Sequence, residues 1–362
     1  MASNYKLIPF FPVYFLVKMV VTNDGISLSR LPVFLTYITR YILLEPIRLL
    51  EILIYDRRIK SHTLKNDPIF IIGHWRSGTS FLQTLLTKDA NNLSTTIYKF
   101  IFSDNYYLTE SWLKKPLNKL SKYFNIKYSF QRLPMNFDIP GELDPGLCAN
   151  CSDHAYTWGH LFPKSYEKWF NRYIIINDDK IAQAWVDEYD YLIRKLSFQN
   201  KNKQIVIKSP GDTGRISVLL NKYPKAKFIY MHRDPIEVFH STFNLWQIIL
   251  KENSFQTINK DKIAEYIISS YKKLLINFLD QKKNMPNSQL IEIEFNDIQE
   301  NTIQVLSRIY AVLNLGSLPI EDINSFLSNN KDYKVNSYAT SEELKSMLQV
   351  EWSFSFKTWA TR

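Results

Sequence analysis

The chain has 362 residues, of which 45% are hydrophobic and 15% aromatic, so it can bury a sizeable core without disulfides or metal ions. Nine glycines and the absence of a low-complexity tract leave little room for long disordered linkers. The net charge of +10 indicates an anionic partner, namely nucleic acid, a membrane surface or a nucleotide-like cofactor. Because no long block of Lys and Arg occurs, we expect no extended nucleic-acid-binding face.

Two apolar stretches, residues 7–21 and 31–55, open the chain. The first is short for a bilayer-spanning helix, which needs about 20 apolar residues. The second has a helical pattern that four charged residues interrupt, namely Arg40, Glu45, Arg48 and Glu51. This favours a helix that lies on a membrane or covers a hydrophobic pocket, with packing on the globular body as the alternative. We expect an N-terminal helical region over residues 1–66, a cytoplasmic location, and membrane contact through residues 5–55 as one of these alternatives.

A buried strand, a tight turn and the start of a helix are predicted for residues 68–86, PIFIIGHWRSGTSFLQTLL. Gly73 and Gly78 have the spacing of an ATP-binding P-loop, but Thr79 stands where that motif requires Lys. Amide groups at a helix start favour a bound phosphate. The turn therefore predicts a site for a 5′-phosphate that does not handle a pyrophosphate and Mg²⁺ in the usual way, with Arg76 as its charge. A generic strand-to-helix turn is the alternative.

Aromatic residues are dense between residues 89 and 173, where no regular period is visible. This composition suits the walls of a pocket for an apolar or ring-shaped ligand, whereas aromatic loops packed on a core are the alternative. We interpret the pair Cys148 and Cys151 as ordinary thiols, because no second cysteine pair accompanies it and Pro145-Gly146 just upstream suggests a turn rather than a redox-active helix start. No metal is expected.

Short apolar strands alternate with helices in the rest of the chain. The strands are predicted at residues 204–207, 227–231 and 290–294, and the helices at 180–199, 216–222, 236–250, 263–279, 303–313 and 320–329. Such alternation indicates an α/β fold with a parallel sheet and ligands at the carboxyl ends of its strands.

Arg233 follows the strand at 227–231, and Ser241 lies about two turns into the next helix. A guanidinium and a hydroxyl at this separation can hold a second phosphate. Taken alone, Arg-Asp-Pro after a strand is more often a helix-starting turn. Its combination with the turn at Gly73 favours the phosphate site.

These two motifs together resemble a known family. GHWRSGTS at 73–80 and MHRDPIEVFHSTFNLW at 231–246 are similar to the 5′-phosphosulfate loop and the 3′-phosphate motif of sulfotransferases that use 3′-phosphoadenosine 5′-phosphosulfate (PAPS). The resemblance continues through residues 207–235 and in VEWSFSF at 350–356. It is greatest to the bacterial-type branch with a hydrophobic amino-terminal region. It implies a P-loop-like three-layer fold, with a mainly parallel sheet flanked by helices, in a domain spanning residues 67–362 with an acceptor-site insertion around 89–173.

By this resemblance, the 5′-phosphosulfate of PAPS is held by the loop residues Arg76, Ser77, Gly78, Thr79 and Ser80. Arg233 and Ser241 hold the 3′-phosphate. A carboxyl-terminal loop that closes over the cofactor corresponds to DYKVNSYA, with Lys334, Asn336 and Tyr338, although a solvated polar loop is the alternative.

Sulfuryl transfer needs cations at the sulfuryl group and a base for the acceptor hydroxyl. Arg76 and Lys208 are the expected cations. Soluble phenol-type enzymes carry a catalytic His two residues after this Lys, where the chain has Pro210. The segment PGELD at 140–144 resembles a Pro-Gln-Glu-x-Glu segment of the related branch, which makes Glu142 the expected base. Asp144, His154 and His160 are the reserve candidates, and a loop carboxylate in water is the alternative for Glu142.

We therefore expect transfer of the sulfuryl group of PAPS to a hydroxyl of a hydrophobic acceptor, such as a sterol or another lipid alcohol. Transfer to a carbohydrate is one alternative, since aromatic side chains also stack on sugars. A membrane-associated P-loop nucleotide-binding or kinase-like protein is another, although Thr79 argues against it. The sequence leaves the acceptor and the oligomeric state open.

Overall fold

The computed structural model describes residues 7–128, 133–329, 338 and 340–359. The chain forms two compact units, which interleave along the sequence. Unit 1 contains residues 1–64, 95–201 and 245–262, and unit 2 contains residues 65–94, 202–244 and 263–362. The division into domains 1–66 and 67–362 stays a prediction.

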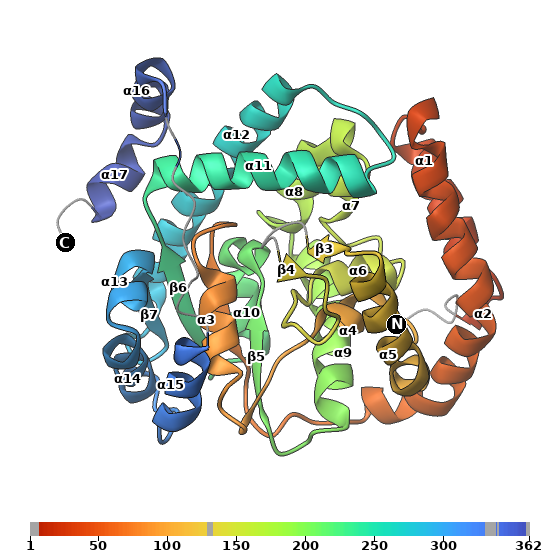
Figure 1. The fold of residues 1–362 in the computed structure, drawn as a ribbon, viewed down its shortest axis with the longest axis horizontal. Helices are drawn as coiled ribbons and strands as arrows, with labels where there is room; N and C mark the ends of the chain where they lie inside the picture. Colours follow the sequence, from red (N-terminus) through yellow and green to blue (C-terminus); the bar gives the residue numbers. More distant parts are fainter. Residues whose placement is uncertain (1–6, 129–132, 330–337, 339, 360–362) are drawn as a thin grey trace. The chain divides into compact units, whose positions relative to one another are not determined.

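Unit 2 is built on a five-stranded sheet with the order β2-β5-β1-β6-β7 (Figure 1). All neighbouring strands are parallel. The strands are β1 (Ile69–Gly73), β2 (Asn92–Leu93), β5 (Gln204–Lys208), β6 (Lys227–His232) and β7 (Leu290–Glu294). The four apolar strands expected from the sequence are confirmed, whereas β2, with only two residues, was not predicted. β-Branched residues in β1 and β5 are buried, as is typical of parallel strands covered on both faces.

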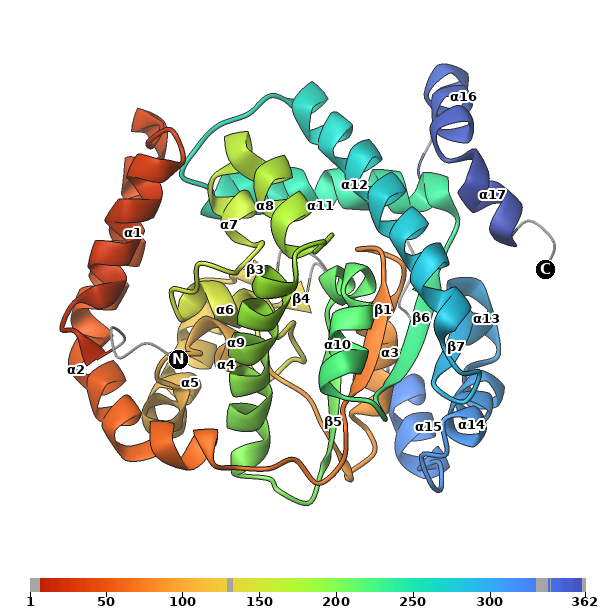
Figure 2. The same cartoon turned by 180° about the vertical axis from the view of Figure 1, so that it is seen from behind.

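Helices cover both faces of this sheet (Figure 2). On one face, Ile71 and Ile229 pack with α3 (Thr79–Leu86), α13 (Phe295–Glu300), α14 (Thr302–Val312) and α15 (Ile320–Ser328). On the other face lie α10 (Ile216–Lys222) and α12 (Lys260–Gln281); the ring of Phe278 in α12 stacks on Tyr230 with 3.7 Å between centroids. The expected three-layer α/β fold is confirmed.

The carboxyl-terminal helices of unit 2 are α16 (Glu342–Glu351) and α17 (Ser353–Trp359). Between them, the buried Trp352 stacks on Tyr271 of α12, with 4.0 Å between ring centroids, and its indole N–H donates to the carbonyl of Ile268. The segment VEWSFSF is thereby anchored on α12.

Unit 1 is mainly helical in its described residues, where β3 (Lys127–Tyr128) also pairs antiparallel with β4 (Leu133–Pro134). Its helices are α1 (Phe11–Thr22), α2 (Leu31–Lys60), α4 (Ile97–Ile101), α5 (Tyr106–Tyr123), α6 (Pro145–Ala149), α7 (Trp158–Leu161), α8 (Tyr166–Tyr173) and α9 (Asp179–Phe198). Residues 89–173 show no regular period in the sequence, yet the structure forms several helices there, of which α5 alone has 18 residues. α11 (Pro235–Asn253) begins in unit 2 and ends in unit 1.

Candidate active site

Two glycines shape the turn between β1 and α3. Gly73 has φ 136°, and a Cβ atom there would lie 2.3 Å from the carbonyl oxygen of Met231 in β6. Gly78 has φ 97°, and a Cβ atom there would lie 2.2 Å from the ring of Phe295. Positive φ and the absence of space both exclude a side chain at these two positions.

Backbone donors gather where this turn enters α3. The amides of Thr79 and Ser80 stand in the first turn of the helix, where an N–H group has no intrahelical acceptor. The hydroxyl of Ser77 donates to the carbonyl of His74 at 2.7 Å, so this side chain closes the turn on itself. Arg76 takes a left-handed conformation with φ 71°. The arrangement suits an anion at the helix start.

The second motif lies against the first. Arg76 Nε donates to Ser241 Oγ at 2.8 Å, and the hydroxyl of Thr242 donates to the carbonyl of Trp75 at 3.2 Å. These two hydrogen bonds join the turn to the first half of α11. The structure therefore brings together two segments that the sequence separates by 165 positions.

Arg233 follows β6 and is held from two sides. Its Nε donates to Glu237 at 2.7 Å, and its guanidinium lies 4.7 Å from the ring centroid of Phe295. Phe295 also fills the space beside Gly78. One aromatic ring thus contacts both predicted phosphate sites.

Lys208 is the last residue of β5 and pairs in register with Ile71 of β1. Its side chain is buried. Nearby, the hydroxyl of Thr213 accepts from the N–H of Gly73 at 2.8 Å and donates to the carbonyl of Gly73 at 3.1 Å. The carboxyl ends of the neighbouring strands β5, β1 and β6 therefore carry Lys208, the turn and Arg233, at the sheet edge where ligands bind in such folds.

Of the three residues expected in a closing loop, only Tyr338 is described. Its ring stacks on that of His240, next to Ser241, with 5.4 Å between centroids and 18° between planes. Thr340 lies 2.8 Å from His240 Nε2. Lys334 and Asn336 lie outside the described residues.

The expected base belongs to unit 1. Glu142 is half-buried, in a segment fixed by the N–H of Gly141, which donates to the carbonyl of Thr95 at 2.9 Å. A Cβ atom on Gly141 would lie 2.7 Å from the ring of Phe100, which explains a glycine where the related branch carries Gln. Asp144 is fully buried before α6 and is therefore less suited to meet a substrate.

The reserve histidines occupy different surroundings. His154 Nδ1 lies 3.5 Å from the Glu188 carboxylate. His160 is enclosed by aromatic rings, and burial lowers its pKa to about 4. A neutral imidazole with so low a pKa is a weak base for an alcohol.

A model of the sulfotransferase family matches residues 68–318 of the chain. The chain belongs to the sulfotransferase family. This sulfotransferase is 25% identical over 308 residues to omega-hydroxy-beta-dihydromenaquinone-9 sulfotransferase Stf3 of Mycobacterium bovis and of Mycobacterium tuberculosis, an alignment that covers 83% of the chain and 76% of each relative.

Two solved structures share the fold. Sulfotransferase STF9 from Mycobacterium avium aligns with a TM-score of 0.75 at 14% identity, over 99% of this chain and 92% of that one. Sulfotransferase STF1 from Mycobacterium tuberculosis aligns with a TM-score of 0.71 at 16% identity, over 97% and 93%. The expected bacterial-type branch and its transferase activity are confirmed.

Sequence reasoning missed several residues that shape the sulfotransferase site. His74 Nδ1 donates to the Trp75 carbonyl at 2.9 Å, and burial lowers the pKa of this imidazole to about 4. Phe295, Thr213 and Thr242 also contact the two motifs. Thr242 lies beside Ser241 and His74 lies within the first motif, whereas the contacts of Phe295 and Thr213 join segments that are distant in the sequence.

The described parts of the chain contain no group of three or more His, Cys, Asp and Glu side chains that could hold a metal ion. None of their helices is both long enough and apolar enough to span a bilayer.

Proposed function

We propose that this sulfotransferase uses PAPS as its donor. The observation that carries the proposal is the hydrogen bond between Arg76 and Ser241, because it places a cation of the first motif beside the hydroxyl of the second. The amides of Thr79 and Ser80 with Arg76 would hold the 5′-phosphosulfate, and Arg233 with Ser241 would hold the 3′-phosphate. Ser77 and Gly78 would shape the loop, and Tyr338, with Lys334 and Asn336, would contribute to the donor site from the closing loop.

The reaction would proceed by attack of an acceptor hydroxyl on the sulfur of PAPS. A new O–S bond forms, and the bond between sulfur and the bridging oxygen breaks, which releases 3′-phosphoadenosine 5′-phosphate. Glu142 takes the proton of the hydroxyl. Lys208 and Arg76 stabilise the charge on the bridging oxygen and the sulfuryl group.

The acceptor class that we propose is a lipid alcohol. The mycobacterial relative is named for a hydroxylated menaquinone derivative, and this chain is 25% identical to it. The dense aromatic side chains of unit 1 suit a ring-containing or isoprenoid acceptor. We also propose a cytoplasmic location with peripheral membrane contact through residues 5–55, where such an acceptor would be available.

An assay with radiolabelled PAPS tests the reaction and its acceptor. We expect label on hydroxylated quinone derivatives, sterols or other lipid alcohols and none on glycans. Label on glycans alone would overturn the lipid proposal. Tight binding of ATP or GTP without labelling of any acceptor would overturn the transferase reaction with PAPS.

The role of Arg233 predicts a selective loss of affinity. Arg233→Ala should weaken binding of 3′-phosphoadenosine 5′-phosphate by at least about tenfold, because a charge-assisted contact to the 3′-phosphate is lost. Binding of adenosine 5′-phosphosulfate, which lacks that phosphate, should stay unchanged. Calorimetric titration measures both affinities. Arg308→Ala, at an exposed site in the same unit, is the control, and equal losses for both nucleotides in Arg233→Ala would contradict the assignment.

The role of Glu142 predicts a loss of turnover alone. Glu142→Gln should lower kcat by about 100-fold or more, since the amide cannot accept the proton, while donor affinity stays the same. Steady-state kinetics and donor titration separate the two effects. Asp144→Asn is the matched control; a fall in kcat there, with full activity in Glu142→Gln, would move the base to Asp144.

A further inference from the structure

In the middle of helix α2, three charged side chains point into unit 1 and large apolar side chains point outward. Glu45, Arg48 and Glu51 are only 2%, 4% and 2% exposed. On the opposite side, Leu43 is 70% and Leu53 72% exposed. Six residues at helical spacing form this surface, which we call the outer face: Leu35, Ile42, Leu43, Leu50, Leu53 and Ile54.

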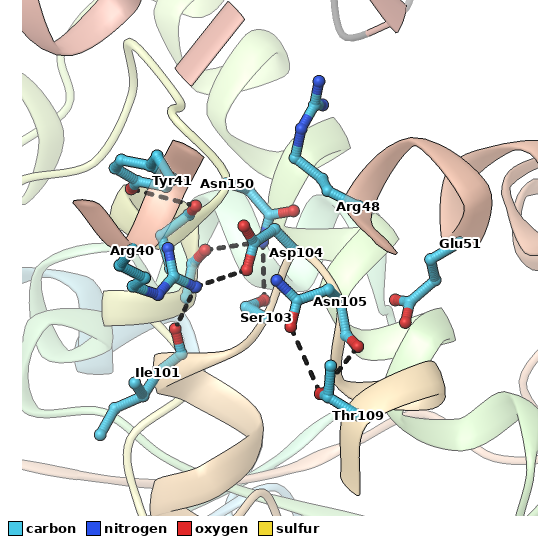
Figure 3. A network of polar contacts seen from close by, with 12 residues as sticks. Arg40, Tyr41, Arg48, Glu51, Ile101, Ser103, Asp104, Asn105, Thr109 and Asn150 are labelled. Atoms are coloured by element: carbon cyan, nitrogen blue, oxygen red, sulfur yellow. Dashed lines mark hydrogen bonds and ion pairs between the residues drawn. The ribbon is translucent and has the colours of Figure 1, made fainter. Parts of the chain in front are cut away.

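Ion pairs within unit 1 explain the inward charges. Arg48 donates to both oxygens of Glu45 at 2.6 and 2.7 Å. Lys195 of α9 pairs with Glu51. Arg40 donates to Asp104 at 2.6 Å and to the carbonyl of Ile101 at 2.8 Å (Figure 3). Because these charges are paired, the polar side of the helix is satisfied inside the protein.

Helix α1 continues the same organisation. It begins beside the middle of α2, where the N–H of Phe10 donates to Glu45 at 2.8 Å. Phe15 is buried against Trp158, whereas Tyr14 and Val21 are 67% and 78% exposed. Two consecutive helices therefore present large apolar side chains to the surroundings.

Basic residues stand at the end of the outer face. Arg57 and Arg58 are exposed in the last turn of α2. The guanidinium of Arg58 and the ammonium of Lys201 both lie over the ring of Phe198, at 5.3 and 5.4 Å from its centroid. We call Arg57, Arg58 and Lys201 the basic end.

We propose that the outer face of α2, with the exposed side of α1, binds the surface of a lipid bilayer, and that the basic end selects bilayers containing anionic lipids. An apolar helix face flanked by cations is the pattern of a helix lying in the membrane interface. The basic end is complementary in charge to anionic lipid headgroups, and it stands beside the apolar side chains that would enter the bilayer interface. The inference rests on the membrane contact proposed above and adds the face, its orientation and its lipid preference.

Vesicle co-sedimentation tests this without donor or acceptor. The full chain should bind vesicles of phosphatidylcholine with about 30% phosphatidylglycerol, and bind phosphatidylcholine alone several-fold more weakly. Leu43→Asp/Leu50→Asp/Leu53→Asp should reduce binding to both by at least about tenfold. Arg57→Gln/Arg58→Gln/Lys201→Gln should abolish the preference for anionic vesicles while retaining the weaker binding.

A triple variant in unit 2 is the matched control. Ile276, Ile320 and Val350 are 50%, 47% and 74% exposed, compared with 70%, 50% and 72% for Leu43, Leu50 and Leu53. Their replacement by Asp should leave vesicle binding unchanged. Equal loss in both triple variants, or no vesicle binding by the full chain, would overturn the proposal. Analytical ultracentrifugation without lipid gives a further test. If the full chain self-associates and the outer-face triple variant does not, the outer face binds a second copy of the chain and the proposal is overturned.

The vesicle-binding experiment and the test of the proposed sulfuryl transfer can fail independently of each other. Sulfuryl transfer to a detergent-dispersed acceptor should be the same in the outer-face variant and the wild type. Vesicle binding without sulfuryl transfer would support the membrane-binding face and contradict the proposed lipid acceptor. Sulfuryl transfer to a lipid alcohol without vesicle binding would support the acceptor and contradict the membrane-binding face.

Discussion

The imidazole of His160 lies in α7 among the rings of Tyr156, Tyr166 and Trp246, with centroid separations of 5.3 to 5.8 Å. Among the described residues, its Nε2 has no hydrogen-bond partner. Burial lowers its pKa to about 4 from the ordinary value of 6.5. Because the folded state resists protonation more than the unfolded state, the stability contributed by the neutral ring is present above pH 6.5 and is lost as the pH falls toward 4.

His160→Phe should remove this loss. A phenyl ring suits the aromatic surroundings and takes no proton. When the pH is lowered from 6.5 to 4, the free energy of unfolding should therefore fall by about 3 kcal/mol less in this variant than in the wild type. Urea titrations across this range measure the free energy of unfolding. His74, which is also buried with a lowered pKa, should retain its own contribution. His154→Phe, at a half-buried site in the same unit, measures the effect of the substitution itself, and equal pH dependence in wild type and His160→Phe would contradict the assignment.

At the scale of elements, α2 and α9 are joined by the ion pair between Glu51 and Lys195, both buried. Lys195 also donates to the carbonyl of Ser103 at 2.7 Å, and Glu51 accepts from the N–H of Leu108 at 3.0 Å. In Figure 3, the carboxylate of Glu51 points from its helix toward the segment that carries Asn105 and Thr109. Desolvation by burial raises the pKa of Glu51, and its lysine partner opposes that shift.

Removing only one partner of this pair should be costly. Lys195→Met should destabilise the protein by about 3 to 5 kcal/mol, because it leaves a carboxylate buried without its cation. Lys195→Met/Glu51→Gln should recover most of that loss, since the amide still accepts from Leu108. Urea unfolding measures both. Lys272→Met, in an exposed pair with Glu351, should cost less than about 1 kcal/mol, and a double variant no more stable than Lys195→Met would show that packing rather than charge sets the cost.

The sequence predicted some elements well because their signals are local. Runs of β-branched residues at 69–72 and 204–207 identified the central strands, and the two glycines identified the tight turn between β1 and α3. In contrast, the helices between residues 89 and 173 were missed, since α4, α6 and α7 have only four or five residues and α5 contains Pro116. Short helices are specified by their surroundings more than by their own period.

The orientation of α2 could not be predicted for another physical reason. A hydrophobic pattern normally turns its apolar side to the core. In this helix, Glu45, Arg48 and Glu51 find partners or backbone donors from elsewhere in unit 1, which reverses the expectation. The contact of Phe295 with Gly78 was equally invisible, because it joins residues far apart in the chain.

At the scale of the whole molecule, the chain passes from one unit to the other after residues 64, 94, 201, 244 and 262. The central strand β1 pairs with β5 and β6, so that Ile69 lies opposite Val206 and Lys227. During synthesis at about 5 to 20 residues per second, β1 therefore waits on the order of 10 seconds for its first neighbour on either side. During that time the nascent chain exposes an apolar strand whose two edges are both unpaired, and an unpaired strand edge is a site at which partly folded chains aggregate.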